Sequence, residues 1–137
     1  MTLRRKAREY ALQMLFQWEI SRQEPERLEA GFWKNMRAEK TTRAFANQLL
    51  EGAVAESKAI DDLLSRHAQN WRLDRMAAVD RAILRLAVYE LCFGADTPPK
   101  VVINEAVELA KKFSSEEAAG FINGILDAIL KTREARE

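Results

Sequence analysis

Residues 80–91 read DRAILRLAVYEL, and this stretch decides the fold class. Apolar side chains recur there and just upstream at the three- and four-residue spacing of one helix face: Met76, Ile83, Leu84, Ala87 and Leu91. Gly94 follows as a C-terminal stop, so we expect a helix over about 74–93. The same periodicity recurs on both sides of this stretch, which predicts an all-α protein.

Five further helical segments are expected around it, over about 3–20, 25–36, 41–67, 97–113 and 114–131. Their start signals are caps and first-turn prolines: Thr41 or Thr42, Asp96 or Thr97 with Pro98 and Pro99, and Ser114 with Glu117 in capping-box spacing. A break at Asn70 and Trp71 divides the chain into helical halves of about 1–69 and 70–137. We therefore expect six to seven helices in two three-helix subdomains that form one domain.

The composition is that of an ordinary globular protein, with 47% hydrophobic and 31% charged residues among 137. Five Gly and three Pro leave little room for the many turns of an all-β fold. Cys92 is the only cysteine, so no internal disulfide is possible. With no signal-peptide pattern and no apolar run of about 20 residues, we expect a cytoplasmic protein without a membrane segment.

Motifs for catalysis or metal binding are missing from the sequence. It contains no Gly-rich phosphate loop, no nucleophile elbow and no His/Cys cluster at metal-ligand spacing. His67 is the only histidine, and we interpret it as a surface residue near a helix end. We expect no catalytic residue, no cofactor and no metal, and hence a protein that is not an enzyme.

Asp80 and Glu90 fall inside the apolar arc of their helix, where carboxylates are unusual. A catalytic pair would need them close together, but ten residues separate their Cα atoms by about 15 Å. Because a lone buried charge is costly, we favour hydrogen bonding or pairing with an arginine from another helix. A third interpretation is that Glu90 faces a partner protein.

Four cations begin the chain: residues 1–12 carry Arg4, Arg5, Lys6 and Arg8 against Glu9, a local charge of +3 in a chain of net charge +1. Three of them, the arginines, fall within one arc of about 100°. The macrodipole disfavours positive charge in a first helical turn, so local stability does not explain the cluster. An anionic partner would explain it, and a simple solvated helix end is the alternative.

Phe121, Asn123 and Gly124 form the last notable stretch. Gly124 inside a helix costs about 1 kcal/mol relative to alanine, which suggests that another helix or a ligand approaches the backbone there. Phe121 could stack on an unpaired base and Asn123 could hydrogen-bond one. The alternative is that Phe121 belongs to the core and Gly124 allows close helix packing.

These residues resemble those of the bacterial NusB family of transcription antitermination factors. Four runs in the same order carry the resemblance, which covers nearly the whole chain: RRKAREYALQMLF at 4–16, DRAILRLAVYEL at 80–91, VINEAVELAKKF at 102–113 and FINGILD at 121–127. The resemblance implies an all-α fold of two three-helix subdomains. It also implies binding of boxA, a short single-stranded RNA element, together with the ribosomal protein NusE.

Site residues follow from the same resemblance. The segment expected to bind RNA is Arg4, Arg5, Lys6 and Arg8, with Phe16 where relatives often carry tyrosine, and with Glu117, Phe121 and Asn123 near the last helix start. Tyr89 and Glu90 are expected at the NusE surface. Further implied partners are NusA, NusG and RNA polymerase on ribosomal RNA operons, and a homodimer is possible.

The resulting hypothesis is a non-enzymatic adaptor in which cations hold the RNA backbone and aromatic and amide groups contact bases. Its main alternative is the N-terminal RNA-binding module of a ribosomal RNA cytosine methyltransferase, which the same helices resemble. A purely structural protein–protein module is a second alternative, with the basic cluster incidental.

Overall fold

The computed structural model describes residues 3–68, 75–94 and 96–136, and this part of the chain is helical without any strand. The helices are α1 (Leu3–Ser21), α2 (Pro25–Trp33), α3 (Lys40–Ala55), α4 (Ser57–His67), α5 (Ala78–Cys92), α6 (Pro99–Phe113) and α7 (Glu116–Arg136). The expected all-α fold is confirmed. None of these helices is long and apolar enough to cross a membrane.

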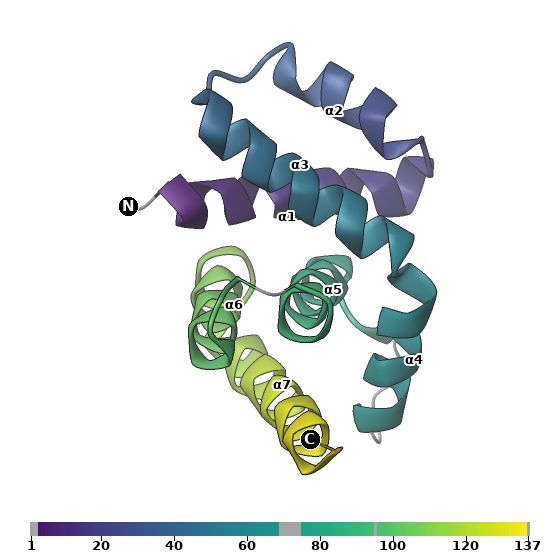
Figure 1. Ribbon diagram of the computed structural model, residues 1–137, viewed down its shortest axis with the longest axis vertical. Coiled ribbons are helices and arrows are strands. Elements are labelled where there is room, and N and C mark those ends of the chain that lie inside the picture. The colour runs from purple at the N-terminus through teal and green to yellow at the C-terminus, as the bar shows by residue number, and fades with distance from the viewer. Residues whose placement is uncertain (1–2, 69–74, 95, 137) are drawn as a thin grey trace.

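Helix α5 is the centre of the fold. It contacts α1 and α3 on one side and α4, α6 and α7 on the others, and Figure 1 shows it beneath the crossed α1 and α3. All residues from Ala82 to Val88 are buried, so the helix is covered all round rather than along one stripe. The amphipathic face expected from the sequence therefore understates how deeply α5 is enclosed.

The buried apolar residues of the described helices form one continuous cluster. Its largest members with almost no exposed surface come from five of the helices, α1, α3, α4, α5 and α7. They are Met14, Leu15, Leu49, Leu50, Ile60, Leu64, Ile83, Leu84, Leu91, Ile122, Leu126 and Ile129, and α6 adds the smaller Val102. The predicted boundary between halves, at Asn70 and Trp71, and the predicted helix start at Asp74 lie outside the described residues.

The segment expected as one helix over 41–67 is two helices, because α3 ends at Ala55 and α4 begins at Ser57. Glu56 leaves the helical conformation, with φ −99° and ψ 14°, while its N–H still donates to the carbonyl of Gly52. This break gives the upper number of the six to seven helices expected.

Three predicted caps are wrong by one to three residues. Helix α3 begins after Glu39, not at Thr41 or Thr42, and α6 begins after Pro98 without a side-chain cap. At α7, Oγ of Ser115, rather than Ser114, accepts a hydrogen bond from the N–H of Ala118 at 3.0 Å. The α7 helix also continues past the predicted end near residue 131. Gly94 after α5 and Pro99 in the first turn of α6 are confirmed.

Candidate nucleic-acid interface

The cations at the start of α1 divide into an outward and an inward pair. Arg4 and Lys6 are exposed. The guanidinium carbon of Arg4 lies 4.2 Å from the centroid of the Phe45 ring, and Nζ of Lys6 lies 3.8 Å from a carboxylate oxygen of Glu9. Both positive charges remain at the surface, where a polyanion can reach them.

Arg8 points inward and is almost completely buried, with a side chain only 5% exposed. Its Nε and Nη2 donate to the two carboxylate oxygens of Glu90 on α5, both at 2.8 Å. Burial disfavours the charged form of Arg8, but the hydrogen bonds to Glu90 outweigh it and raise the pKa of Arg8 above its usual value. Such a bidentate pair is the strong form of an ion pair. Arg8 therefore joins α1 to α5.

Arg5 reaches the neighbouring helix α6, where its Nη2 donates to Glu105 at 2.8 Å and its Nε donates at 3.1 Å. The hydrogen bond to Glu105 is the largest cause that raises the pKa of Arg5. An external anion is thus not needed to explain Arg5 and Arg8, whose carboxylate partners within the chain lie 100 and 82 residues away. Carboxylates from α5 and α6 offset the unfavourable interaction of these cations with the helix dipole. The sequence alone does not predict which carboxylates do so.

Glu9 ties the start of α1 to the end of α6. Its buried carboxylate accepts a hydrogen bond from Nζ of Lys112 at 2.9 Å. Lys112 lies four residues before Glu116, the first residue of α7. The start of α1 and the connection between α6 and α7 therefore lie at the same end of the molecule.

Two exposed phenylalanines accompany these cations. Phe16 is 39% exposed, and its spacing of seven residues puts it on the same face of α1 as Glu9, two turns further along the helix. Phe113, at the end of α6, is 38% exposed and lies under Lys112, with Nζ 5.4 Å from the ring centroid. Phe113 was not among the site residues expected from the sequence. The adjacent Lys111 and Lys112 were the signal that this last turn leaves the core.

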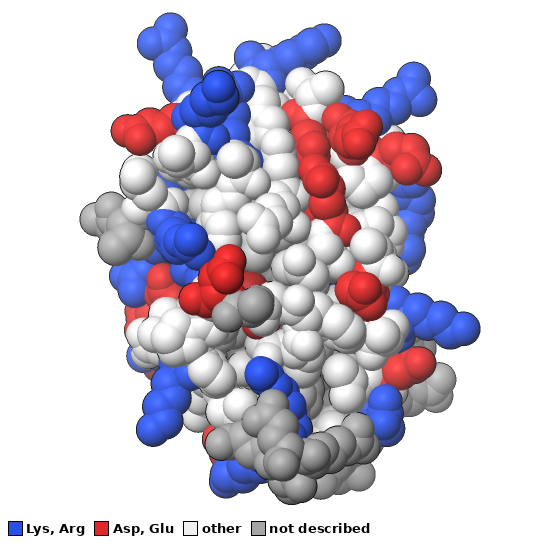
Figure 2. Space-filling view, viewed as in Figure 1, with Lys and Arg blue, Asp and Glu red and all other residues white. Residues whose placement is uncertain are grey.

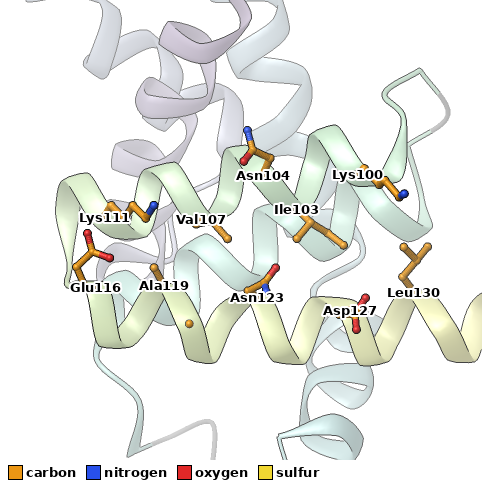
Figure 3. Close-up of a pocket in the computed structure, with 11 residues that line it drawn as sticks. Lys100, Ile103, Asn104, Val107, Lys111, Glu116, Ala119, Asn123, Asp127 and Leu130 are labelled. Carbon is orange, nitrogen blue, oxygen red and sulfur yellow. The ribbon is translucent and has the colours of Figure 1, made fainter.

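Phe121 and Asn123 lie on different sides of α7, because two residues in a helix differ by about 200°. Phe121 is half-buried against the core, whereas Asn123 is exposed in a groove of about 640 Å³ between α6 and α7. Figure 3 shows Asn123 between α6 and α7, with Lys111 and Glu116 at one end of the groove. Asn104 of α6 also lines the groove. The structure thus does not bring the predicted stacking ring and the predicted amide together.

Two glycines lie on the exposed surface of α7. A Cβ added at Gly124 or Gly120 would meet nothing within 4 Å, so close packing of another helix does not require either glycine. Glu117 is exposed beside them and adds negative charge at the helix start. The predicted roles of Glu117, Phe121 and Asn123 toward RNA stay predictions.

Tyr89 and Glu90, expected at a partner surface, both pack within the chain. The Tyr89 ring rests against Gly52 of α3, so that a Cβ at Gly52 would lie 2.0 Å from Cζ of the ring. Glu90 is 7% exposed, and its pairing with Arg8 confirms the expected arginine partner. Asp80 differs, since its Oδ1 is buried and accepts no hydrogen bond within the described part of the chain. A direct role of Tyr89 and Glu90 toward a partner stays a prediction.

Charge of either sign is distributed over the molecule rather than segregated. On the face in Figure 2, lysines and arginines stand mostly at the rim and acidic residues lie among them.

Within the described residues, no group of three or more His, Cys, Asp and Glu side chains could hold a metal ion. His67 is half-buried, with Nδ1 2.9 Å from the Leu63 carbonyl and Nε2 3.2 Å from the Thr132 hydroxyl.

The model of the NusB family matches residues 5–131. A curated relative, transcription antitermination protein NusB of Koribacter versatilis, is 47% identical over 133 residues, which are 96% of this chain and 91% of the relative. The solved structure of T. maritima NusB has a TM-score of 0.84 at 39% identity, covering 96% of this chain and 92% of that one. A second, of antitermination factors NusB and NusE in complex with dsRNA, has a TM-score of 0.85 at 34% identity, covering 96% and 98%.

Proposed function

The chain belongs to the NusB family, and from this premise we propose that it is a non-enzymatic, RNA-binding transcription antitermination factor. Its RNA ligand is the single-stranded boxA element of ribosomal RNA operon transcripts, bound together with NusE in the cytoplasm. NusA, NusG and RNA polymerase complete the larger complex.

One observation carries this proposal: the ion pair between Glu9 and Lys112 gathers cations from the start of α1 and the end of α6. Lys6 and Lys112 are exposed beside Glu9. Arg4 is exposed at the same end of α1, over Phe45 of α3. Phe16 and Phe113 present rings on α1 and α6. A single strand needs both kinds of group, since cations hold its phosphates and rings stack on its bases. A relative's structure with NusE and dsRNA supports the choice of partner and ligand class.

The exposed cations supply affinity that falls with salt, because each phosphate contact releases counterions from the RNA. Phe16 and Phe113 supply stacking, which depends little on base identity. Asn123, which was expected to read a base, lies on the groove side of α7 and would have to contact a strand that continues over that helix. NusE provides additional surface that contacts the RNA strand and so raises the affinity of the complex for the RNA.

Fluorescence anisotropy with labelled boxA RNA tests the proposal. We expect the chain to bind boxA more tightly than a scrambled strand of the same composition, and NusE to increase this preference. Equal binding of both strands, with and without NusE, would contradict the proposal.

A double variant tests which surface is used. Arg4→Ala with Lys6→Ala should lower the slope of log affinity against log salt by about 1.4, at about 0.7 per phosphate contact on a single strand. The matched control removes two exposed cations elsewhere, Lys34→Ala and Lys58→Ala, and should leave the slope close to that of the unmodified chain. Equal losses in both double variants would show that binding is not confined to the α1 start.

A further inference from the structure

Two cations with partly exposed side chains cover two buried carboxylates where α1 meets α6. The Arg5 side chain is 42% exposed and its partner Glu105 is 10% exposed. Lys112 is 50% exposed and its partner Glu9 is 5% exposed. In both pairs the positive group is the outer one, so it can turn toward solvent while the carboxylate stays in place. The four residues line a small cavity of about 120 Å³ together with Arg8, Glu108 and Leu109.

The inner carboxylates each have a second cation. An oxygen of Glu105 lies 3.6 Å from Nη1 of Arg8, and an oxygen of Glu9 lies 3.8 Å from Nζ of Lys6. If Arg5 moves away, Glu105 keeps the nearby charge of the buried Arg8. Departure of Arg5 therefore does not leave Glu105 as an uncompensated buried charge, which would be costly.

We infer that Glu105 is an internal competitor for RNA: it occupies the Arg5 guanidinium until an RNA phosphate replaces it. The inference rests on the proposed RNA-binding function and adds a residue that limits the affinity of that site. Glu105 occupies the Nε–Nη2 edge of Arg5, and a phosphate binds the same planar fork, so the two anions compete for that edge. Separating Arg5 from Glu105 then costs free energy and lowers the net affinity for RNA.

Removal of the competing charge tests this exchange. Glu105→Gln keeps the shape of the side chain, and we expect it to raise affinity for boxA RNA about two- to fivefold, the scale of one solvent-accessible ion pair. Glu108→Gln is the matched control, because Glu108 lines the same cavity and its charge raises the pKa of Arg5 less than Glu105 does. It should change affinity less than Glu105→Gln does.

A double-mutant cycle separates exchange on Arg5 from general repulsion. In an Arg5→Gln background, which should itself bind RNA more weakly, Glu105→Gln should produce no gain. An equal gain in both backgrounds, or equal gains for Glu105→Gln and Glu108→Gln, would overturn the inference while leaving the proposed function intact. Failure of the unmodified chain to bind RNA would overturn both.

NMR of the arginine Nε–H groups in the unmodified chain covers the case in which Glu105→Gln does not fold. Addition of boxA RNA should shift the Arg5 signal, because Nε exchanges a carboxylate for a phosphate. The Arg8 signal should move less, since its Nε remains bonded to Glu90. An unchanged Arg5 signal at saturating RNA would refute the exchange.

Discussion

Two regions of the molecule bury a carboxylate to the same extent, but they give it different hydrogen-bond and charge partners. At the junction of α1, α5 and α6, Glu90 is 7% exposed and both of its oxygens accept hydrogen bonds from Arg8. At the contact of α2 with α3, Glu29 is also 7% exposed, but it meets Glu51, another carboxylate. Burial, and then the hydrogen bond and charge of Glu51, raise the pKa of Glu29 to about 8.

The difference shows that burial alone does not give an acid its charge state or its role. Glu90 holds α1 to α5, because a bidentate arginine replaces the water that its carboxylate has lost. Glu29 is protonated near neutral pH, and its Oε2 accepts no hydrogen bond from the described residues. The first region should therefore respond strongly to loss of a charge, and the second to a change of pH.

Arg8→Ala is expected to have the largest effect on stability. It leaves Glu90 buried without its bidentate partner, and removal of one member of a buried pair costs about 3–5 kcal/mol. Urea unfolding followed by circular dichroism measures the loss. A double variant, Arg8→Met with Glu90→Leu, should recover much of it because no charge is left buried. A single variant as stable as the unmodified chain would show that the pair does not hold α1 in place.

Gly52→Ala tests a neighbouring contact that contains no charge. The added Cβ would lie 2.0–2.3 Å from three atoms of the Tyr89 side chain, so α3 or the ring must shift. Overpacking of this kind costs about 1–3 kcal/mol. Gly31→Ala is the matched control, since a Cβ there meets nothing within 4 Å and alanine favours a helix. If both variants are equally stable, Tyr89 does not pack as tightly as the structure shows.

Glu29→Gln addresses the second region and should act through pH. The pKa of Glu29 is raised on folding from 4.5 to about 8, so the unfolded chain releases this proton first. The stability that it contributes is complete below about pH 4.5 and is lost as the pH rises through about 8. At low pH the substitution should change stability little, because it replaces a neutral acid with a neutral amide. As the pH rises above about 4.5 the unfolded glutamate ionises, so Glu29→Gln should become more stable than the unmodified chain near neutral pH.

Urea midpoints at several pH values between 5 and 9 check this expectation. The midpoint of the unmodified chain should fall with rising pH, and that of Glu29→Gln should fall less. Glu26→Gln is the control, since Glu26 is exposed on the same helix. Parallel pH profiles for all three proteins would mean that Glu29 does not titrate in this range.

The comparison also shows what the sequence can predict. Helical periodicity predicted the helices but joined 41–67 into one, because a break at Glu56 needs no special residue type. The arginine partner of Glu90 was expected from the cost of burying a charge. That it is Arg8, 82 residues away, depends on how α1 crosses α5, and no local pattern records that.

The candidate site was harder to predict for the same reason. A helical wheel puts Arg4, Arg5 and Arg8 on one arc, but it does not show which part of that arc another helix covers. The structure covers Arg8, half-covers Arg5 and leaves Arg4 at the surface. Phe113 was missed because apolar spacing does not show whether the last turn of a helix packs against the core or extends beyond the neighbouring helices.

Lys6→Ala should have the smallest effect on stability and sharpens the contrast with Arg8. Lys6 is exposed and lies 3.8 Å from Glu9, which keeps Lys112, so we expect a loss within about 0.5 kcal/mol. The same substitution should lower the slope of log RNA affinity against log salt by about 0.7, because one phosphate contact is lost. Arg8→Lys keeps the positive charge but loses the bidentate guanidinium. It should reduce stability and change the slope of log RNA affinity against log salt only a little. Salt titrations and urea unfolding of both variants decide the matter: if Arg8→Lys changes the slope as much as Lys6→Ala does, then Arg8 contacts RNA directly and its pairing with Glu90 opens on binding.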